Sequence, residues 1–256
     1  MGGRVMSQKE VGHQFLARLG KKRLRPGGVE ATNWLIQQGE FSSDCKVLEV
    51  ACNRCTTSIE LAQTYQCHIT AVDLDTKVLA EARKAIEVAQ MQDYIHLTQA
   101  NALKLPFADN SFDIVINEAM LTMLNDAAKE KALKEYWRVL KPGGRLLTHD
   151  VSYEADETKA VIEQLRDTIN VNVSPLQLDA WRQLLVKSGF TAVNYSYGNM
   201  TLMSPLGMIK DEGVVDAIRI MLRGMKKENR KQFLKMRHFF NKTGRKLCYI
   251  AAVSQK

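Results

Sequence analysis

Short apolar runs alternate with longer amphipathic segments between residues 46 and 150. The longer segments repeat apolar residues every three or four positions, as Val78, Ala82 and Ile86 do, which is the period of a helix packed on one face. The pattern predicts helices at 56–65, 76–90 and 126–140, and strands at 45–50, 68–75, 95–101, 111–119 and 141–151. Strands that alternate with helices of this length predict an α/β fold with a Rossmann-like, mostly parallel sheet and helices on both faces.

The rest of the chain departs from this alternation. The pattern predicts further helices at 157–169 and 174–190, and strands at 190–198 and 246–255. Residues 204–244, between the last two strands, look helical and basic, and so long an insertion in a compact domain is usually functional. We therefore predict an N-terminal helical segment at 1–44, a core at 45–203 and 245–256, and a helical basic lid at 204–244.

Composition narrows the class of protein. The 256 residues are 45% hydrophobic, which is enough for one sizeable core with a small cap. There is no run of ~18 apolar residues and residues 1–15 lack an apolar signal core, so we expect a cytoplasmic monomer or homodimer without a membrane span. Cys52 and Cys55 form a C-x-x-C that redox or zinc chemistry could use. Since no second cysteine pair accompanies it, we expect no metal.

Charge is concentrated in one late segment. The formal net charge is +8, yet residues 219–246 hold eleven Lys or Arg against one acid, Glu228, while the rest holds 25 basic and 27 acidic residues. A solvated helix face explains this pattern, and so does a patch for an anionic substrate or nucleic acid. Phe233, Phe239 and Phe240 have a helical spacing that suits core packing better than base stacking.

The stretch 47-VLEVACNRCTTSIELAQ-63 has the form of a nucleotide-binding loop without its glycines. In an open parallel sheet, ligands collect at the carboxyl ends of the strands, where the N-terminus of the next helix can bind a negatively charged group. Ala51, Asn53 and Cys55 stand where glycine is usual; small residues allow close approach, and asparagine tolerates a left-handed backbone. We expect Asn53 either to have a positive φ or to bond its own turn, and we expect no disulfide between Cys52 and Cys55.

Asp73 ends the next predicted strand, 24 positions after Glu49. An acid at about this distance can accept hydrogen bonds from the two ribose hydroxyls of a nucleotide-type cofactor. The alternative is that Asp73 caps the helix at 76–90, although Asp75 or Thr76 could take that role as well.

Four sequence blocks carry a resemblance to a known family: VLEVACNRC at 47–55, AVDLD at 71–75, QANALKLPFADNSFDIVI at 99–116 and EYWRVLKPGGRLL at 135–147. In this order and spacing they resemble the class I S-adenosylmethionine-dependent methyltransferases, in particular the small-molecule branch (methyltransferase type 11) with the ubiquinone/menaquinone-type enzymes. The resemblance covers about residues 45–150. It implies a seven-stranded sheet with an antiparallel last strand, S-adenosyl-L-methionine as cofactor and S-adenosylhomocysteine as product.

The resemblance also assigns cofactor-binding roles by position. The segment 25-RPGGVEAT-32 is similar to one that closes over the methionine end of the cofactor in phosphoethanolamine- and glycine-betaine-type relatives. Residues that would hold this end are Arg25, Gly28, Glu49, Ala51, Cys52 and Asn53. The others are Asp73 for the ribose, Leu74, Asn101 and Ala102 for the adenine, and Asn117 near the sulfonium. Turn chemistry is the alternative for Asn101 and Asn117, and a helix start at Pro26 for the first segment.

Glu118, His149 and Asp150 are the candidate catalytic bases, because they lie near the carboxyl ends of two central strands and a hydroxyl acceptor must lose a proton. A histidine that serves this purpose in the phosphoethanolamine-type relatives is replaced here by Thr122. The predicted function is methyl transfer to a small molecule through an O, N or S nucleophile. The alternatives are an RNA methyltransferase that binds RNA through residues 219–246, and a cofactor-binding member without catalysis. A small molecule is the favoured partner, and nucleic acid is less favoured.

Overall fold

The computed structural model describes residues 10–155 and 159–256. The first nine residues, on which part of the signal-peptide argument rests, lie outside the described residues, as does the start of the helix predicted at 157. No helix in the described ranges is long and apolar enough to cross a lipid bilayer.

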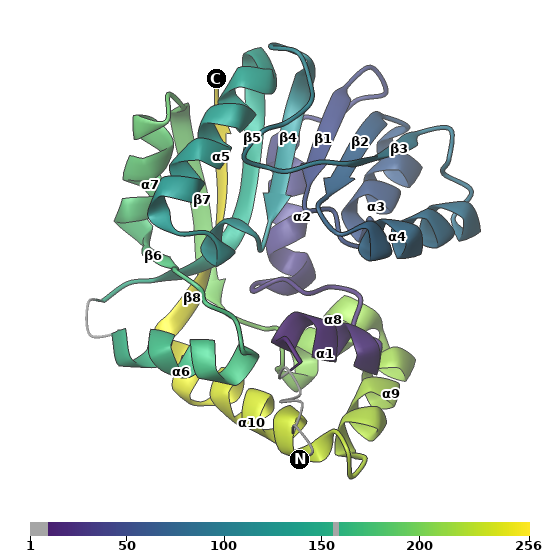
Figure 1. Ribbon diagram of the computed structural model, residues 1–256, viewed down its shortest axis with the longest axis vertical. Coiled ribbons are helices and arrows are strands. Elements are labelled where there is room, and N and C mark those ends of the chain that lie inside the picture. Colours follow the sequence, from purple (N-terminus) through teal and green to yellow (C-terminus); the bar gives the residue numbers. More distant parts are fainter. Residues whose placement is uncertain (1–9, 156–158) are drawn as a thin grey trace, which may run out of the picture.

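The strands form one mixed sheet in the order β3-β2-β1-β4-β5-β8-β7 (Figure 1). Its members are β1 (Lys46–Val50), β2 (His68–Asp73), β3 (Ile95–Gln99), β4 (Phe112–Glu118), β5 (Leu140–Tyr153), β7 (Thr191–Asn199) and β8 (Leu247–Gln255), and the two-residue β6 (Leu176–Gln177) pairs with β5. β1 to β5 pair in parallel, whereas β8 lies antiparallel between β5 and β7. The predicted fold class is therefore confirmed, including the antiparallel last strand.

Helices cover both faces of this sheet. Neighbouring strand residues point to opposite faces, so Leu48 belongs to one hydrophobic cluster and Val47 to the other. The first cluster packs against α5 (Asp126–Val139) and α7 (Leu178–Lys187), and the second against α2 (Gly28–Gly39), α3 (Thr56–Tyr65) and α4 (Thr76–Val88). Burial on both faces explains why these strands read as nearly continuous apolar runs.

A separate helical layer, here called the helical cap, lies beyond the carboxyl end of β4, whose arrowhead points toward it in Figure 1. It consists of α1 (Gly12–Leu19), α6 (Lys159–Ile169), α8 (Pro205–Glu212), α9 (Val214–Met225) and α10 (Arg230–Asn241), which share a third hydrophobic cluster. Within the residues 204–244 of the predicted insertion, the structure has the helices α8, α9 and α10. Packing adds α1 and α6 to the same layer, because Phe15 and Leu165 are buried in its core.

The segment that joins α1 to α2 is fastened to the helical cap by buried charges. Lys21 Nζ lies 2.8 Å from a carboxylate oxygen of Asp211, and both side chains are almost fully buried. Glu212 accepts hydrogen bonds from the backbone N–H groups of Lys22 at 3.0 Å and Arg23 at 2.9 Å. The C-terminal end of α8 thus determines the path of this segment across the sheet edge.

Candidate functional site

A cavity of about 950 Å³ lies between the carboxyl ends of the strands and the helical cap. One wall is formed by loops of the sheet, and its residues include Glu49, Ala51, Cys52, Asn53, Asp73, Leu74, Asn101, Ala102 and Glu118. The opposite wall is formed by α1 and the segment after it, and includes His13, Gln14, Ala17, Arg18, Lys22 and Arg25. The predicted cofactor residues, apart from Gly28 and Asn117, are therefore brought together around one space.

The glycine-poor loop adopts the backbone that glycines would provide. Ala51, Asn53 and Cys55 have φ angles of 58°, 48° and 56°, all in the left-handed region. The predicted positive φ of Asn53 is therefore confirmed. The turn is closed by a 2.8 Å hydrogen bond from the Cys55 N–H to the Cys52 carbonyl. Each left-handed residue with a Cβ costs roughly 1–2 kcal/mol, so the loop is held by its surroundings rather than by its own preference.

The two cysteines of this loop are free thiols. Cys55 is fully buried and Cys52 nearly so. A hydrogen bond with Cys55, together with burial, raises the pKa of the Cys52 thiol well above its usual range. Cys52 therefore stays protonated. Because only the thiolate form attacks or binds metal, Cys52 serves as a compact apolar part of the cavity wall.

Glu49 lies buried beneath the start of α3. Its carboxylate accepts a 3.1 Å hydrogen bond from the Ser58 N–H and a second bond from the Ser58 hydroxyl. Burial raises the pKa of Glu49 to about 7, against the opposing effect of the Ser58 hydrogen bonds. A carboxyl at the N-terminus of a helix is favourably placed with respect to the helix dipole.

Asp73 faces the cavity and also holds the glycine-poor loop. Its two carboxylate oxygens accept hydrogen bonds from the N–H groups of Asn53 at 3.1 Å and Asp75 at 3.0 Å. Asp75, and not Asp73, caps α4, through a 2.8 Å bond from the Lys77 N–H. Beside them Leu74 lines the cavity with 65% of its surface exposed, which offers an apolar face to a flat ring.

The two asparagines that the resemblance singled out have different environments. Asn101 lines the cavity, and its Oδ1 accepts a 2.9 Å hydrogen bond from the Leu103 N–H, as in an ordinary turn. Asn117 is fully buried and does not line the cavity. Neither polar atom of its side chain has a hydrogen-bond partner among the described residues. The proposed role of Asn117 near the sulfonium therefore stays a prediction without a contact to support it.

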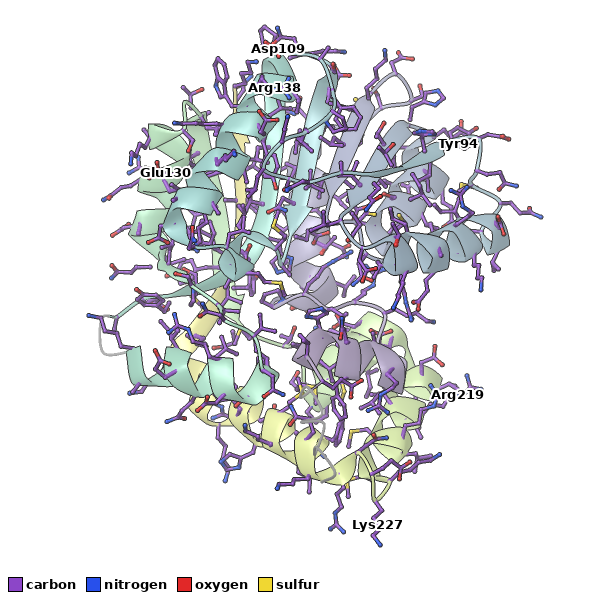
Figure 2. All side chains as sticks on the ribbon, in the orientation of Figure 1. Tyr94, Asp109, Glu130, Arg138, Arg219 and Lys227 are labelled. Carbon is purple, nitrogen blue, oxygen red and sulfur yellow. The ribbon has the colours of Figure 1, made fainter. Side chains whose placement is uncertain are left out.

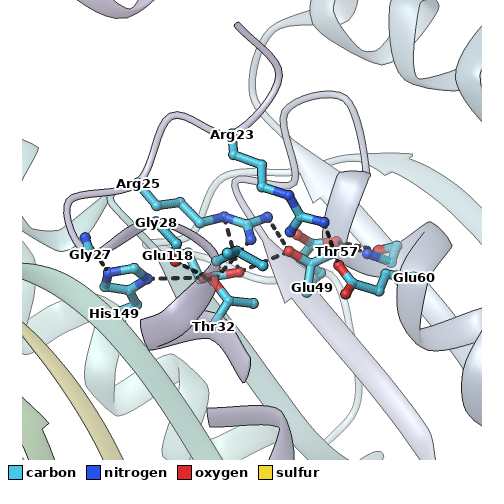
Figure 3. A network of polar contacts seen from close by, with 12 residues as sticks. Arg23, Arg25, Gly27, Gly28, Thr32, Glu49, Thr57, Glu60, Glu118 and His149 are labelled. Atoms are coloured by element: carbon cyan, nitrogen blue, oxygen red, sulfur yellow. Dashed lines mark hydrogen bonds and ion pairs between the residues drawn. The ribbon is translucent and has the colours of Figure 1, made fainter. Parts of the chain in front are cut away.

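Glu118 is the centre of a buried polar network (Figure 3). One carboxylate oxygen accepts from the Thr57 hydroxyl at 2.8 Å and lies 3.3 Å from Arg25 Nε. The other accepts from the Thr32 hydroxyl at 2.7 Å and lies 3.1 Å from His149 Nδ1. Arg25 also donates to both threonines. These side chains, which we call the Glu118 network, join the segment before α2, α2 itself, the start of α3, β4 and β5.

Both ring nitrogens of His149 are engaged in this network. Nε2 accepts a 3.0 Å hydrogen bond from the Gly27 N–H, so the proton of the ring belongs on Nδ1, which donates to Glu118. His149 is fully buried and does not line the cavity. It therefore has no free nitrogen with which to take a proton from an acceptor.

The remaining two candidate bases are also occupied. Burial alone would raise the pKa of Glu118, but Arg25, His149 and Thr32 outweigh it and lower the pKa to about 2. Asp150 is fully buried away from the cavity, and its carboxylate accepts from the N–H groups of Thr122 at 3.1 Å and Val151 at 3.0 Å. The three candidates thus act in this structure as buried hydrogen-bond partners, and their catalytic role stays a prediction.

The residues that sequence reasoning missed come mainly from α1. His13, Gln14 and Ala17 form the cavity wall opposite the strand ends. Burial lowers the pKa of His13, and the nearby charge of Asp73 opposes this only in part. The amphipathic pattern of α1 indicates two faces, but only tertiary packing decides that the polar face lies over the cavity.

The topology and this site define a Rossmann-like protein with a nucleoside-type cofactor pocket at the carboxyl ends of its strands, and sequence comparisons agree. A family model described as a methyltransferase domain matches residues 47–144. An uncharacterised protein of Haemophilus influenzae is 55% identical over 98% of this chain and 100% of its own length. A ubiquinone/menaquinone biosynthesis C-methyltransferase of Ruegeria sp. is 36% identical over 108 residues, which is 42% of this chain and 41% of that protein.

Structural comparison extends over nearly the whole chain. A crystal structure of a proposed sarcosine dimethylglycine methyltransferase from Galdieria sulphuraria matches with a TM-score of 0.76 and 17% identity. The match covers 96% of this chain and 98% of that one, and it shows a shared fold. The chain belongs to the class I S-adenosylmethionine-dependent methyltransferases. The match spans less than half of the Ruegeria relative.

The cavity fits the cofactor of this class, S-adenosyl-L-methionine. The fit rests on the chemistry of the wall: a carboxylate at Asp73 for hydroxyl donors, an exposed apolar face at Leu74, and a carboxyl at Glu49 for a cationic group. The left-handed turn at 51–55 lets the backbone approach a ligand closely. We expect these residues to hold the cofactor, with Asn101 and Ala102 at its adenine.

Replacing Ala51 with glycine should raise the free energy of unfolding by about 0.5–1 kcal/mol, because glycine adopts a left-handed backbone without a Cβ clash. The same substitution at Ala80, exposed within α4, should lower it by about 1 kcal/mol. Urea unfolding measures both values. Equal losses at the two positions would show that the loop carries no backbone strain.

Replacing Glu118 with glutamine should lower the free energy of unfolding by about 3–5 kcal/mol, because Arg25 would keep its buried charge without a partner. Combining this change with Arg25→Met should recover part of the loss. The control is Glu81→Gln, whose partner Arg54 is solvent-accessible, and its effect should stay below about 1 kcal/mol. Chemical denaturation of the three variants and the unaltered protein gives these values, and a double variant no more stable than E118Q would contradict the pairing.

The raised pKa of Glu49 predicts that folding stability falls as pH rises from about 5 to 8. The folded protein keeps this proton up to about pH 7, whereas the ordinary value is 4.5, so the folded state binds more protons in that window. Glu49→Gln should remove this pH-dependent component, because glutamine does not titrate. The fold should be kept, because the amide oxygen can still accept from Ser58. Thermal unfolding across the pH range provides the comparison. An identical pH slope in both proteins would be evidence against a protonated Glu49.

Proposed function

We propose that this enzyme transfers the methyl group of S-adenosyl-L-methionine to a small-molecule acceptor bound beside α1, and releases S-adenosylhomocysteine. The observation that carries the proposal is the size of the cavity. About 950 Å³ lies near the upper end of the range of roughly 300–1,000 Å³ found for ligand pockets. The predicted cofactor residues account for one wall, and the acceptor is placed beside His13, Gln14, Ala17 and Met123, which line the same cavity.

The cofactor supplies an electrophilic methyl group on a sulfonium. The protein's contribution is to align the acceptor and to exclude water, which α1 and Arg25 do by closing the side of the cavity opposite the strands. The side-chain atoms of Glu118 and His149 that could take a proton are already engaged in hydrogen bonds. A methyl acceptor that loses its proton easily, such as a thiol or an amine, therefore suits this site best. His13 is uncharged near neutral pH and is the candidate for any proton that must be removed.

RNA is the weaker alternative for the acceptor. The phenylalanines of the basic segment, Phe233, Phe239 and Phe240, are all buried in the helical cap and offer no stacking surface. None of the described residues that line the cavity comes from the basic segment 219–246. These two features favour a small molecule.

We also propose a reducing cytoplasm as the compartment and leave the oligomeric state as monomer or homodimer. The five cysteines are free thiols, and Cys52 and Cys55 remain unlinked although they face each other across one turn. Thiols in this state are typical of a reducing environment.

The function is tested with S-adenosylmethionine labelled in its methyl group. Incubation of the enzyme with a low-molecular-mass metabolite fraction should place the label in small molecules and not in total RNA supplied in parallel. Asp73→Asn should weaken cofactor binding about tenfold in isothermal titration and reduce labelling accordingly, since it removes a charged acceptor. Label recovered only in RNA would overturn the small-molecule assignment. No heat of cofactor binding in the unaltered enzyme would overturn the activity altogether.

A further inference from the structure

The helix α9 carries apolar side chains on a face that nothing in the described structure covers. Ala217, Ile220 and Gly224 are buried against the core of the helical cap. On the outer side five more apolar residues are between 41% and 66% exposed: Val214, Val215, Ile218, Leu222 and Met225. Four of them, from Val215 on, follow the i, i+3, i+7, i+10 spacing of a single helical face. We call these five residues the apolar stripe of α9.

An exposed apolar stripe of this kind indicates an interaction surface. A helix that is apolar on both faces is normally buried, and contiguous exposed apolar surface marks an interaction site. Isolated exposed apolar residues elsewhere, such as Val88 and Val186, belong to no such row. Leu206 and Ile209 on the adjoining α8 are exposed as well, so the apolar surface belongs to this part of the helical cap and not to the molecule as a whole.

The charge around the stripe indicates the chemistry of the partner. The segment 219–246, which begins within α9, carries eleven basic residues and one acid. Arg219 and Lys227 project outward from the rim of the helical cap in Figure 2. Lys226 and Lys227 are exposed, and within the described residues neither forms a salt bridge. Arg219 pairs with Asp216, so the unpaired charge beside the stripe comes from these two lysines. Apolar side chains beside unpaired lysines are the signature of a helix that lies in the interface of an anionic lipid bilayer.

We propose that α9, together with the basic residues that follow it, docks this protein reversibly on anionic membrane surfaces. The apolar stripe of α9 inserts among the headgroups, while Lys226, Lys227 and their neighbours meet the negatively charged lipids. A second copy of the chain fits less well, because pairing the stripes would bring two cationic segments together. RNA would satisfy the charges but leave the aliphatic stripe in water.

The docking surface lies next to residues that line the cavity. Lys22, which lines the cavity, forms a 3.0 Å ion pair with Asp216 in the first turn of α9. Arg18, another cavity residue, donates a 3.1 Å hydrogen bond to Asn229, just before α10. A docked molecule would therefore hold its cavity close to the bilayer surface. The proposal itself rests on the stripe and its charges, and does not depend on the identity of the acceptor.

Vesicle sedimentation tests the proposal. The full-length protein should pellet with phosphatidylcholine vesicles that contain phosphatidylglycerol, should not pellet with phosphatidylcholine alone, and should be released as salt is raised. The double variant Ile218→Gln/Leu222→Gln should bind about tenfold more weakly, since both side chains lose their apolar insertion. Lys226→Gln/Lys227→Gln should bind about 25-fold more weakly, because each surface cation that is removed contributes about fivefold in affinity.

The controls separate docking from folding and from activity. Val186→Gln, a comparably exposed change on α7, should leave vesicle binding unaltered. Cofactor titration should be the same in all variants, so a failure of methyl transfer and a failure of docking are read independently. Equal binding of the I218Q/L222Q variant and the unaltered protein would overturn the proposal. So would a homodimer in sedimentation velocity that this variant dissociates, or salt-sensitive RNA retention without vesicle binding.

Discussion

The buried charge of Glu118 is the constraint on which the arrangement of this site depends. A carboxylate with 6% of its side chain exposed is tolerated only when hydrogen bonds and an opposite charge replace its water, and here Arg25, Thr32, Thr57 and His149 do so. These partners come from segments far apart in sequence. Satisfying one carboxylate therefore forces the chain before α2 to lie across the ends of β4 and β5, and α1 follows it over the cavity.

The second anchor of that segment is the pair formed by Lys21 and Asp211. This pair holds the other side of residues 20–27, the segment between α1 and α2, which we call the strap. There Glu212, at the end of α8, also accepts hydrogen bonds from the backbone N–H groups of residues 22 and 23. Gly28 is required at this junction: its φ is +61°, and a Cβ would stand 2.4 Å from an oxygen of Asp211. The strap is thus held between the sheet and the helical cap by largely buried charges, which makes the cavity wall a fixed part of the fold.

Periodicity was sufficient to predict the sheet, its parallel centre and the helices at 56–65 and 126–140, because burial on both faces leaves unmistakable apolar runs. It could not predict partners that meet only through tertiary packing. Arg25 was expected to help hold the methionine end of the cofactor, and in this structure it pairs with Glu118. His149 and Asp150 stand near the catalytic edge in sequence, yet β5 continues to Tyr153 and places both inside the protein. Which face of a strand or helix meets a cavity is a property of the assembled layers.

The helical cap faces two different environments, the interior of the protein and its outer surface. Its inner side must be complementary to the strap and the cavity, and Asp211, Asp216 and Asn229 provide the polar contacts for this. Its outer side has no such requirement, so nothing in the fold explains why α9 keeps aliphatic residues there instead of the polar ones that folding alone would favour. Exposed aliphatic side chains give no stability to an isolated molecule, and they increase the risk of aggregation. Their presence beside unpaired cations is therefore best explained by an environment that contacts both, which is the argument for a charged lipid surface.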